Sequence, residues 1–384
     1  MRNFLRCACL ASALAVAATP VRAEIVVGFI TALSGNAASI GIPYAKGIAA
    51  AFAYRSEVAG QKIRFIQLDD GSDPSATTRN ARKLIEDEKV DVLIGTATGP
   101  GTVALAAVAD EMKVPLIAVS PMAARPANPA DQWAVTMPQS PQLLVKVIVD
   151  RMKRDGKKNI GFIGFSDVWG DFVYGGAKAA EERGDIKLLS NERYSRTDTS
   201  VTGQILKVLA SHPDAVLNGG SGTQGALPLL ALAERGFKGG SYGTAALVNA
   251  DFIRVGGKAA EGVQVTTGPV IVAEQLPDDH FAKKPALAFR EAYLKANGTP
   301  TTDGFSAYSF DAWLVLADAA ERAMKTAQPG TQAFHAALRD AILSTHELAG
   351  THAIYNFKPG ETYGIDERSL VVVKLVGGKW IYAP

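Results

Sequence analysis

The side chains that most often carry out catalysis are few in this sequence and form no catalytic pattern. No H-x-x-x-H or H-E-x-x-H pair occurs among the five histidines, which are His212, His280, His335, His346 and His352. Such pairs place two imidazoles on one helix face to hold a metal ion, so we expect no metal site built from them. The serine-containing segments 164–168 and 219–223 lack the second glycine of a nucleophile elbow. The sequence therefore predicts a protein that is not an enzyme and uses no metal or cofactor.

Two consecutive carboxylates, Asp69 and Asp70, follow an apolar run and have the residue types of an acid/base or metal pair. Successive residues of a strand point to opposite faces of a sheet, so these two side chains should diverge. We therefore expect a structural role, in which one of them caps or braces the loop 71–73.

A glycine-rich stretch, 95–102, has the composition of a loop that binds an anion through backbone N–H groups. It lacks the Gly-x-Gly-x-x-Gly and Gly-Lys-Ser/Thr spacings of nucleotide-binding loops, which disfavours a nucleotide. A carboxylate suits it better, because the start of a helix offers unpaired N–H donors and the positive end of the helix dipole. The alternative is a tight turn that only caps the helix. Thr98, Gly99 and Gly101 are the candidate ligand residues of this stretch.

Small polar residues also follow other apolar runs. One run ends at Ser120, and Ser221 with Gly222 follows another. Trp169 follows a third run, where an aromatic ring could cover a ligand or simply pack in the core. Because the carboxyl ends of parallel strands meet at one edge of a sheet, we expect these loops to face a single polar cleft.

The elements that must position these loops alternate between short β-branched runs and amphipathic segments. The first series of expected strands is 25–30, 63–68, 90–95 and 114–119, and the second is 159–165, 186–189, 215–218 and 263–266. Helical segments separate them, as strands of a parallel sheet require. Helices at 285–296, 305–325 and 334–344 follow, and a final pair of strands is expected near 353–357 and 370–375.

No low-complexity linker separates the two series, so we expect two α/β lobes with parallel central sheets joined by more than one crossing of the chain. Crossings near 134–137, 265–268 and 349–351 would make a three-crossover hinge with a cleft beside it. The predicted lobes are 24–136 with 268–348, and 137–267 with 349–384.

Residues 1–23 have the features of a secretory signal peptide: two early arginines, a short apolar segment at 10–18, and a small-x-small motif ending at Ala23. Cleavage after Ala23 would export the chain to the periplasm and remove Cys7 and Cys9, the only cysteines. Three of the 40 Lys and Arg residues lie in this leader, which leaves 37 against 38 Asp and Glu. Such a balance, without a basic block, disfavours nucleic-acid binding. No later stretch has the ~20 apolar residues of a membrane span.

Several segments together resemble the type I periplasmic solute-binding proteins of the leucine/isoleucine/valine-binding kind, which serve ABC importers. The segments are Ile25–Gly35, Asp69-Asp70 followed by Asp73-Pro74, 92–95, 114–117, 165–170, and 249–252 before Gly256-Gly257. Two further stretches, 196–203 and 270–276, resemble a subgroup associated with aromatic carboxylates.

The resemblance implies two Rossmann-like lobes that close on a ligand, with a carboxylate held by the loops 98–101 and 120–124 of the first lobe. It implies an aromatic lid at Trp169. Amino-acid binders of the family place a glutamate, which pairs with the ligand ammonium, where this chain has Ala245. The full set of expected ligand residues is Ser39, Thr98, Gly99, Gly101, Ser120, Met122, Ala123, Asp167, Trp169, Ser221, Gly222, Thr244 and Ala245.

The sequence thus predicts a monomeric periplasmic protein that closes on a small carboxylate, such as a benzoate or cinnamate derivative, and delivers it to an ABC transporter permease in the inner membrane. An ammonium buried without a carboxylate partner is costly, which disfavours an amino acid. The alternatives are a branched-chain or aromatic amino-acid binder, in which another acid such as Asp167 reaches the ammonium, and a secreted hydrolase on a similar scaffold.

Overall fold

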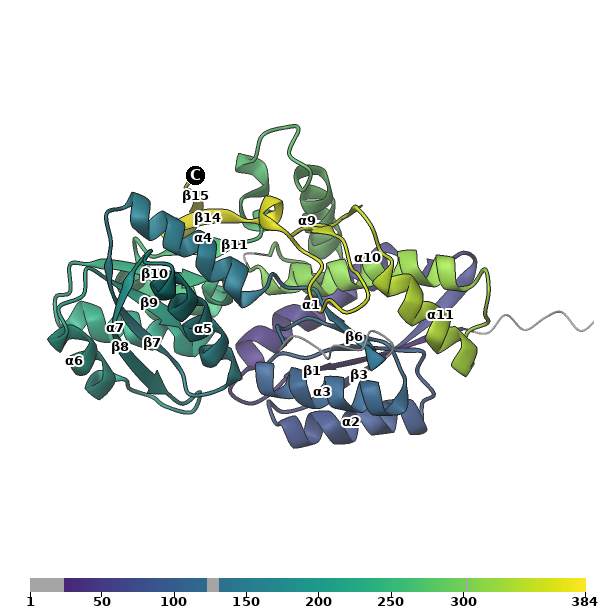
Figure 1. The fold of residues 1–384 in the computed structure, drawn as a ribbon. Helices are drawn as coiled ribbons and strands as arrows, with labels where there is room; N and C mark the ends of the chain where they lie inside the picture. The colour runs from purple at the N-terminus through teal and green to yellow at the C-terminus, as the bar shows by residue number, and fades with distance from the viewer. Residues whose placement is uncertain (1–23, 123–130, 302) are drawn as a thin grey trace, which may run out of the picture.

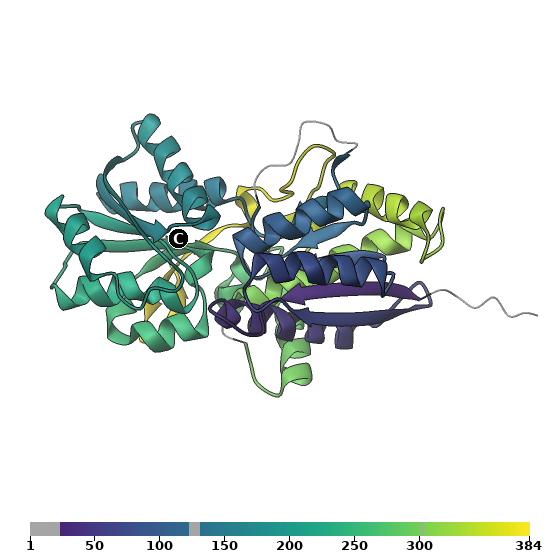
Figure 2. The same ribbon diagram turned by 90° about the horizontal axis from the view of Figure 1, so that it is seen from below.

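The computed structural model describes residues 24–122, 131–301 and 303–384. The predicted leader, 1–23, and the predicted ligand residue Ala123 lie outside the described residues. Figure 1 shows two lobes joined side by side, and Figure 2 shows them from below, with the yellow C-terminal segment running from one lobe to the other.

The first lobe, called lobe 1 below, is built on a sheet with the strand order β2-β3-β1-β4-β5-β6. All neighbouring strands are parallel except β2 and β3, which form an antiparallel hairpin. In chain order the elements are β1 (Ile25–Thr31), α1 (Ala38–Tyr54), β2 (Glu57–Val58), β3 (Gln61–Asp69), α2 (Pro74–Glu86), β4 (Val92–Gly95), α3 (Gly99–Met112), β5 (Leu116–Ala118) and β6 (Ala134–Thr136).

The second lobe, lobe 2, is built on a sheet with the order β15-β14-β11-β10-β9-β7-β8. Its elements are α4 (Pro141–Arg154), β7 (Asn159–Phe165), α5 (Val168–Glu182), β8 (Lys187–Tyr194), α6 (Thr202–Ala210), β9 (Ala215–Gly219), η2 (Thr223–Ala226), α7 (Leu227–Glu234), β10 (Gly240–Thr244), η3 (Ala245–Leu247), α8 (Ala250–Gly256), η4 (Gly257–Ala260), β11 (Gln264–Thr267), η6 (Glu367–Ser369), β14 (Val371–Val376) and β15 (Lys379–Tyr382). In this sheet β14 pairs antiparallel with both β11 and β15. With the β2–β3 hairpin in the first sheet, both sheets are mixed and mostly parallel, whereas the sequence predicted parallel sheets.

The chain crosses between the sheets three times, after β6, after β11 and before β14, as predicted. The second crossing continues into η5 (Pro269–Gln275), α9 (Lys283–Asn297), α10 (Phe305–Ala323) and α11 (Gln332–Leu343), and the third contains the short pair β12 (Leu348–Ala349) and β13 (Ile354–Tyr355). Strands β2, β10 and β15 were not predicted. The β10 sequence, GSYGT, is poor in the branched side chains that mark strands, and the two flanking strands β9 and β11 hold it in the sheet.

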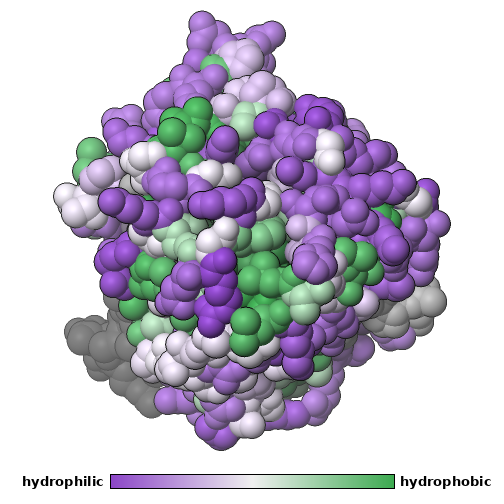
Figure 3. Space-filling view, turned by 90° about the vertical axis from the view of Figure 1, so that its left-hand side faces the viewer, coloured by the Kyte–Doolittle hydropathy of each residue, from purple (hydrophilic) through white to green (hydrophobic). Residues whose placement is uncertain are grey.

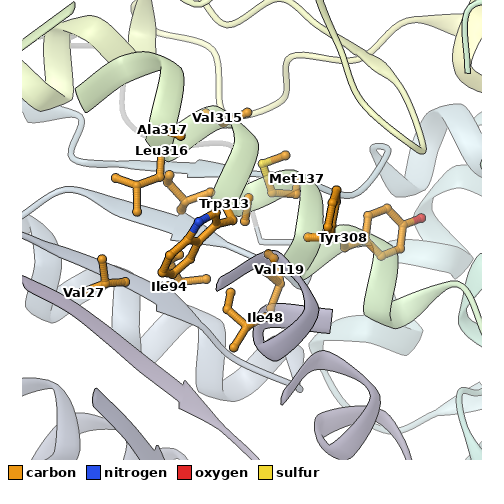
Figure 4. Close-up of a cluster of buried hydrophobic side chains, with 14 of the residues drawn as sticks. Val27, Ile48, Ile94, Val119, Met137, Tyr308, Trp313, Val315, Leu316 and Ala317 are labelled. Atoms are coloured by element: carbon orange, nitrogen blue, oxygen red, sulfur yellow. The ribbon is translucent and has the colours of Figure 1, made fainter. Parts of the chain in front are cut away.

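The first sheet lies between two helical layers, with α1 and α10 on one face and α2 and α3 on the other (Figure 1). Trp313 of α10 is fully buried in the core and lies near Val27, Ile94 and Ile48 (Figure 4). Its indole N–H donates to the Arg55 carbonyl at 2.8 Å. Trp313 therefore packs α10 against the lobe 1 sheet and against the end of α1.

No helix among the described residues is long and apolar enough to cross a membrane. Figure 3 shows the lobe 2 end of the molecule, where hydrophilic residues surround a smaller hydrophobic area.

Candidate ligand-binding site

A cavity lies between the lobes. Both lobes contribute to its walls, which are mainly apolar and aromatic. The lining residues are Ile40, Tyr44, Ala97, Gly99, Ser120, Pro121, Pro138, Leu144, Trp169, Arg196, Ser221, Ala245, Ala246, Phe305 and Tyr308. Five of the predicted ligand residues are in this set: Gly99, Ser120, Trp169, Ser221 and Ala245.

The glycine-rich loop offers the cavity fewer donors than the sequence suggests. Thr98 caps α3, and its hydroxyl accepts the Gly101 N–H at 3.1 Å. Pro100 has no N–H, so Gly99 is the position of the first turn whose N–H remains for a ligand. A side chain at Gly99 would meet Val168 of lobe 2 at 2.9 Å, so this position allows the lobes to approach closely.

The paired carboxylates diverge, as expected, and both brace loops. Asp69 accepts from the backbone N–H of Leu33 at 2.8 Å. Asp70 is buried and accepts from the hydroxyls of Thr96, at 2.5 Å, and Thr77, at 2.9 Å. Asp70 therefore positions Thr96, the residue before the cavity-lining Ala97. From the sequence we expected one of the two carboxylates to brace only the loop 71–73.

The loop after β5 contributes one predicted residue to the cavity. Ser120 lines it, and its carbonyl accepts from the Thr136 hydroxyl at 2.9 Å. Met122 does not line the cavity; it is buried in the core between the sheet, α2 and α3. Tyr44 and Tyr308, which were not predicted, add two rings to the lobe 1 wall, and their hydroxyls donate to Val119 O and Gln139 Oε1.

Arg196 is the main cavity-lining residue that was not predicted from the sequence, although it begins a segment noted for its resemblance. Its side chain is 14% exposed and lies over the Phe165 ring, 4.1 Å from the centroid. Nε donates to Asp167 Oδ2 at 2.5 Å, and Nη1 donates to Ser221 Oγ at 3.1 Å. Its place just after β8, at the end of a strand, was an available signal.

Asp167, predicted as a ligand residue, does not line the cavity. It caps α5, where Oδ1 accepts the N–H groups of Trp169 at 2.9 Å and Gly170 at 3.2 Å, and Oδ2 accepts from Arg196. Both oxygens are therefore engaged within lobe 2. The carboxylate orients Arg196 beside the cavity.

Trp169 and Ala245 lie in the lobe 2 wall. The Trp169 indole N–H donates to the Gly220 carbonyl at 3.3 Å, which fixes the ring against the cavity. Ala245 begins the short helix η3, whose cap, Thr244, accepts the Ala246 N–H at 3.4 Å. Thr244 itself is fully buried outside the cavity lining.

Ser39 and Gly222, both predicted to bind ligand, are also outside the cavity lining. They face each other where the lobes touch, beside the lining residue Ile40.

The charge of the cavity wall is simple. Among the described lining residues Arg196 is the one charged side chain, and there is no carboxylate. In the described parts of the chain no three His, Cys, Asp or Glu side chains gather as metal ligands. This arrangement can hold a small molecule, and it contains no nucleophile and general base in contact.

Two α/β lobes around one small-molecule cavity are the architecture of a solute-binding protein. The family model described as periplasmic binding protein matches residues 24–358, so the chain belongs to that family and is a non-enzymatic solute-binding protein of the ABC importer class. It is 23% identical to the Leu/Ile/Val-binding protein homolog 3 of Brucella melitensis, over 80% of this chain and 82% of that protein.

Two solved structures from Rhodopseudomonas palustris are similar. An extracellular ligand-binding receptor of strain HaA2 has 40% sequence identity and a TM-score of 0.90, over 94% of this chain and 100% of that one. A solute-binding protein of an ABC transporter, solved in complex with benzoate, has 20% identity and a TM-score of 0.75, over 94% and 95% of the two chains. This second likeness shows the fold alone.

Proposed function

We propose that this protein binds a small monocarboxylate with an apolar, aromatic body and delivers it to an ABC permease. The observation that carries the proposal is the charge of the cavity wall, in which Arg196 is the one charged group among the described lining residues. A guanidinium pairs well with a carboxylate, because its N–H groups match the two oxygens.

The donors for the carboxylate come from both lobes. Arg196 uses two of its five N–H groups on Asp167 and Ser221, which leaves donors for a ligand. The Gly99 N–H and the Ser120 hydroxyl add to them from lobe 1. A ligand held in this way ties the two lobes together, so binding favours closure.

The body of the ligand would lie against rings and small apolar residues. Tyr44, Trp169, Phe305 and Tyr308 supply four aromatic rings to the cavity wall. Ala245 leaves room at the position where the family's amino-acid binders carry a glutamate. An aromatic acid fills such a space with apolar contact and needs no further polar partner.

An amino acid is the second candidate, and the Leu/Ile/Val-binding homologue is the observation in its favour. Its ammonium needs an acceptor, and a desolvated ammonium without a carboxylate carries a large penalty. Asp167, the acid suggested for this role, already pairs with Arg196. We therefore place an amino acid second.

The family also suggests where the protein works. We propose that residues 1–23 direct export and are removed after Ala23, and that the mature protein acts as a periplasmic monomer.

The test is a set of matched ligands that differ in one group. We would measure affinities by isothermal titration calorimetry for 3-phenylpropanoate and phenylalanine, and for 4-methylpentanoate and leucine. Each pair shares a carbon skeleton and differs by the ammonium group. Neutral 3-phenylpropanamide serves as the control for the carboxylate charge, and benzoate and cinnamate extend the aromatic series.

The proposal expects the deamino acid of each pair to bind more tightly and the amide to bind at least about tenfold more weakly than its acid, because it lacks a charge-assisted hydrogen bond. Tighter binding of phenylalanine or leucine than of its deamino partner would overturn it in favour of the amino-acid function.

A further inference from the structure

Ser39 of α1 forms two hydrogen bonds with lobe 2. Its carbonyl accepts from Asn249 Nδ2 at 2.5 Å, and its hydroxyl accepts the Thr223 N–H at 3.4 Å. Ser39 lies in α1, Thr223 begins η2, and Asn249 caps α8, so one residue of lobe 1 touches two elements of lobe 2.

The backbone of α8 orients the Asn249 side chain for this contact. Its Oδ1 accepts the N–H groups of Asp251, at 2.9 Å, and Phe252, at 3.2 Å. These bonds fix the amide plane, so the NH₂ group points to Ser39 without further loss of side-chain freedom. Asn249 is 1% exposed, which protects the contact from competing water.

Gly222 makes the close approach possible. It has a φ of +53°, which favours glycine, and an added Cβ would lie 2.7 Å from Ser39 Oγ. The same part of lobe 2 touches lobe 1 a second time, because the Gly304 N–H donates to the Val248 carbonyl at 3.2 Å. The contact region is therefore continuous along residues 248–249.

We propose that Ser39, Asn249, Thr223 and Gly222 form a closure latch, which sets ligand affinity through the open–closed equilibrium without touching the ligand. Ser39 and Gly222 are positioning residues in this view. The latch joins the lobes beside Ile40, which lines the cavity, so opening the cavity at this edge breaks both hydrogen bonds. The inference rests on the proposed function in that closure matters only for a protein that binds a ligand between its lobes.

The decisive substitution is Asn249→Asp. Aspartate caps helices as well as asparagine, so α8 keeps its two cap bonds. The change removes the Nδ2 donor and places a carboxylate against the Ser39 carbonyl. Asp73→Asn is the matched control, because Asp73 caps α2 in lobe 1 through Ser75 and lies 3.9 Å from Arg79 of the same helix, so its contacts in the described structure stay within lobe 1.

Lobe closure can be followed without a ligand. The chain from residue 24 onward has no cysteine, so Glu57→Cys in β2 and Leu206→Cys in α6 would place one exposed fluorophore on each lobe. We expect Asn249→Asp to shift the single-molecule energy-transfer distribution toward longer distances, and Asp73→Asn to leave it unchanged. Equal distributions for Asn249→Asp and wild type would overturn the latch, whatever ligand the protein takes.

Affinity for 3-phenylpropanoate supplies the second readout. We expect Asn249→Asp to weaken it by about tenfold, mainly through faster dissociation, since a bound ligand is released when the lobes open. The thermal unfolding midpoint of ligand-free Asn249→Asp should match that of ligand-free Asp73→Asn. Failure of wild type to bind 3-phenylpropanoate would count against the proposed function. The energy-transfer comparison of Asn249→Asp with wild type needs no ligand, so it would still test whether the latch holds the lobes together.

Discussion

Arg196 donates its Nε–H to Asp167 Oδ2 at 2.5 Å, and this ion pair joins the residues that follow two neighbouring strands, β8 and β7. Asp167 at the same time caps α5, the helix that carries Trp169. The guanidinium and the indole of the cavity wall are therefore positioned by one carboxylate.

A double variant separates the two roles of this pair. Asp167→Asn retains a capping oxygen for α5 but loses the acceptor for Arg196 Nε, while Arg196 keeps its bond to Ser221. We therefore expect this variant to bind 3-phenylpropanoate about threefold more weakly than wild type. Adding Arg196→Met removes the cation without leaving a buried carboxylate unpaired, and affinity should fall at least about tenfold further. Calorimetry measures both steps. Equal affinities for the single and double variants would mean that Arg196 does not contact the ligand.

A carboxylate at residue 245 should repel the proposed ligand. Ala245 lines the cavity and is 9% exposed. We expect Ala245→Glu to weaken 3-phenylpropanoate binding by at least about tenfold more than Ala245→Gln, which has nearly the same volume and no charge. Titrations of both variants at one pH give the comparison. If glutamine weakens binding as much as glutamate, the effect of position 245 is one of size.

Trp169 should report binding through its fluorescence. Trp169 is the tryptophan of the cavity lining, whereas Trp133, Trp313 and Trp380 lie elsewhere in the described structure. We expect wild type to change its emission on titration with cinnamate, and Trp169→Phe to lose that change while binding, measured by calorimetry, persists. Trp380→Phe is the control and should keep the signal. A persistent signal in Trp169→Phe would place the ligand away from this ring.

The free energy of unfolding should depend on pH through two buried groups at the third crossing, Asp311 and His352, whose effects have opposite signs. Burial raises the pKa of Asp311 to about 6, although it accepts the backbone N–H groups of Thr351 and His352. The folded state then binds more protons than the unfolded state between about pH 4 and 6, so this group makes stability fall as pH rises through that window. Burial lowers the pKa of His352 to about 4, so this group makes stability rise with pH between about 4 and 6.5.

Single variants should therefore change the pH dependence of the free energy of unfolding in opposite directions relative to wild type. His352→Gln can still donate to the Gly304 carbonyl, which His352 Nε2 contacts at 2.7 Å, and its slope between about pH 4 and 6 should be more negative than that of wild type. The slope for Asp311→Asn should be more positive than that of wild type. Urea unfolding across this pH range measures both. Parallel pH profiles for the two variants would contradict the assignment.

Most of the helices and strands, and their order, can be predicted from the sequence, because apolar runs, proline starts and polar caps are local signals. Asp73-Pro74 begins α2, with Asp73 accepting the Ser75 N–H at 2.9 Å, and a capping side chain before a proline is such a signal. The alternation of apolar runs and amphipathic segments also predicts the loops at the strand ends. Five predicted residues of these loops line the cavity: Gly99, Ser120, Trp169, Ser221 and Ala245. Strand β10 escaped prediction because its place in the sheet comes from its neighbours.

The contacts of each loop residue depend on how distant parts of the chain come together. Asp167 and Arg196 are 29 residues apart, and Ser39 and Asn249 are 210 apart. No local pattern links such residues, since the pairs form only when parallel strands align their ends and the two lobes meet. Ser39 and Gly222 therefore looked like ligand residues in the sequence, whereas in the folded chain they lie where lobe 1 touches lobe 2.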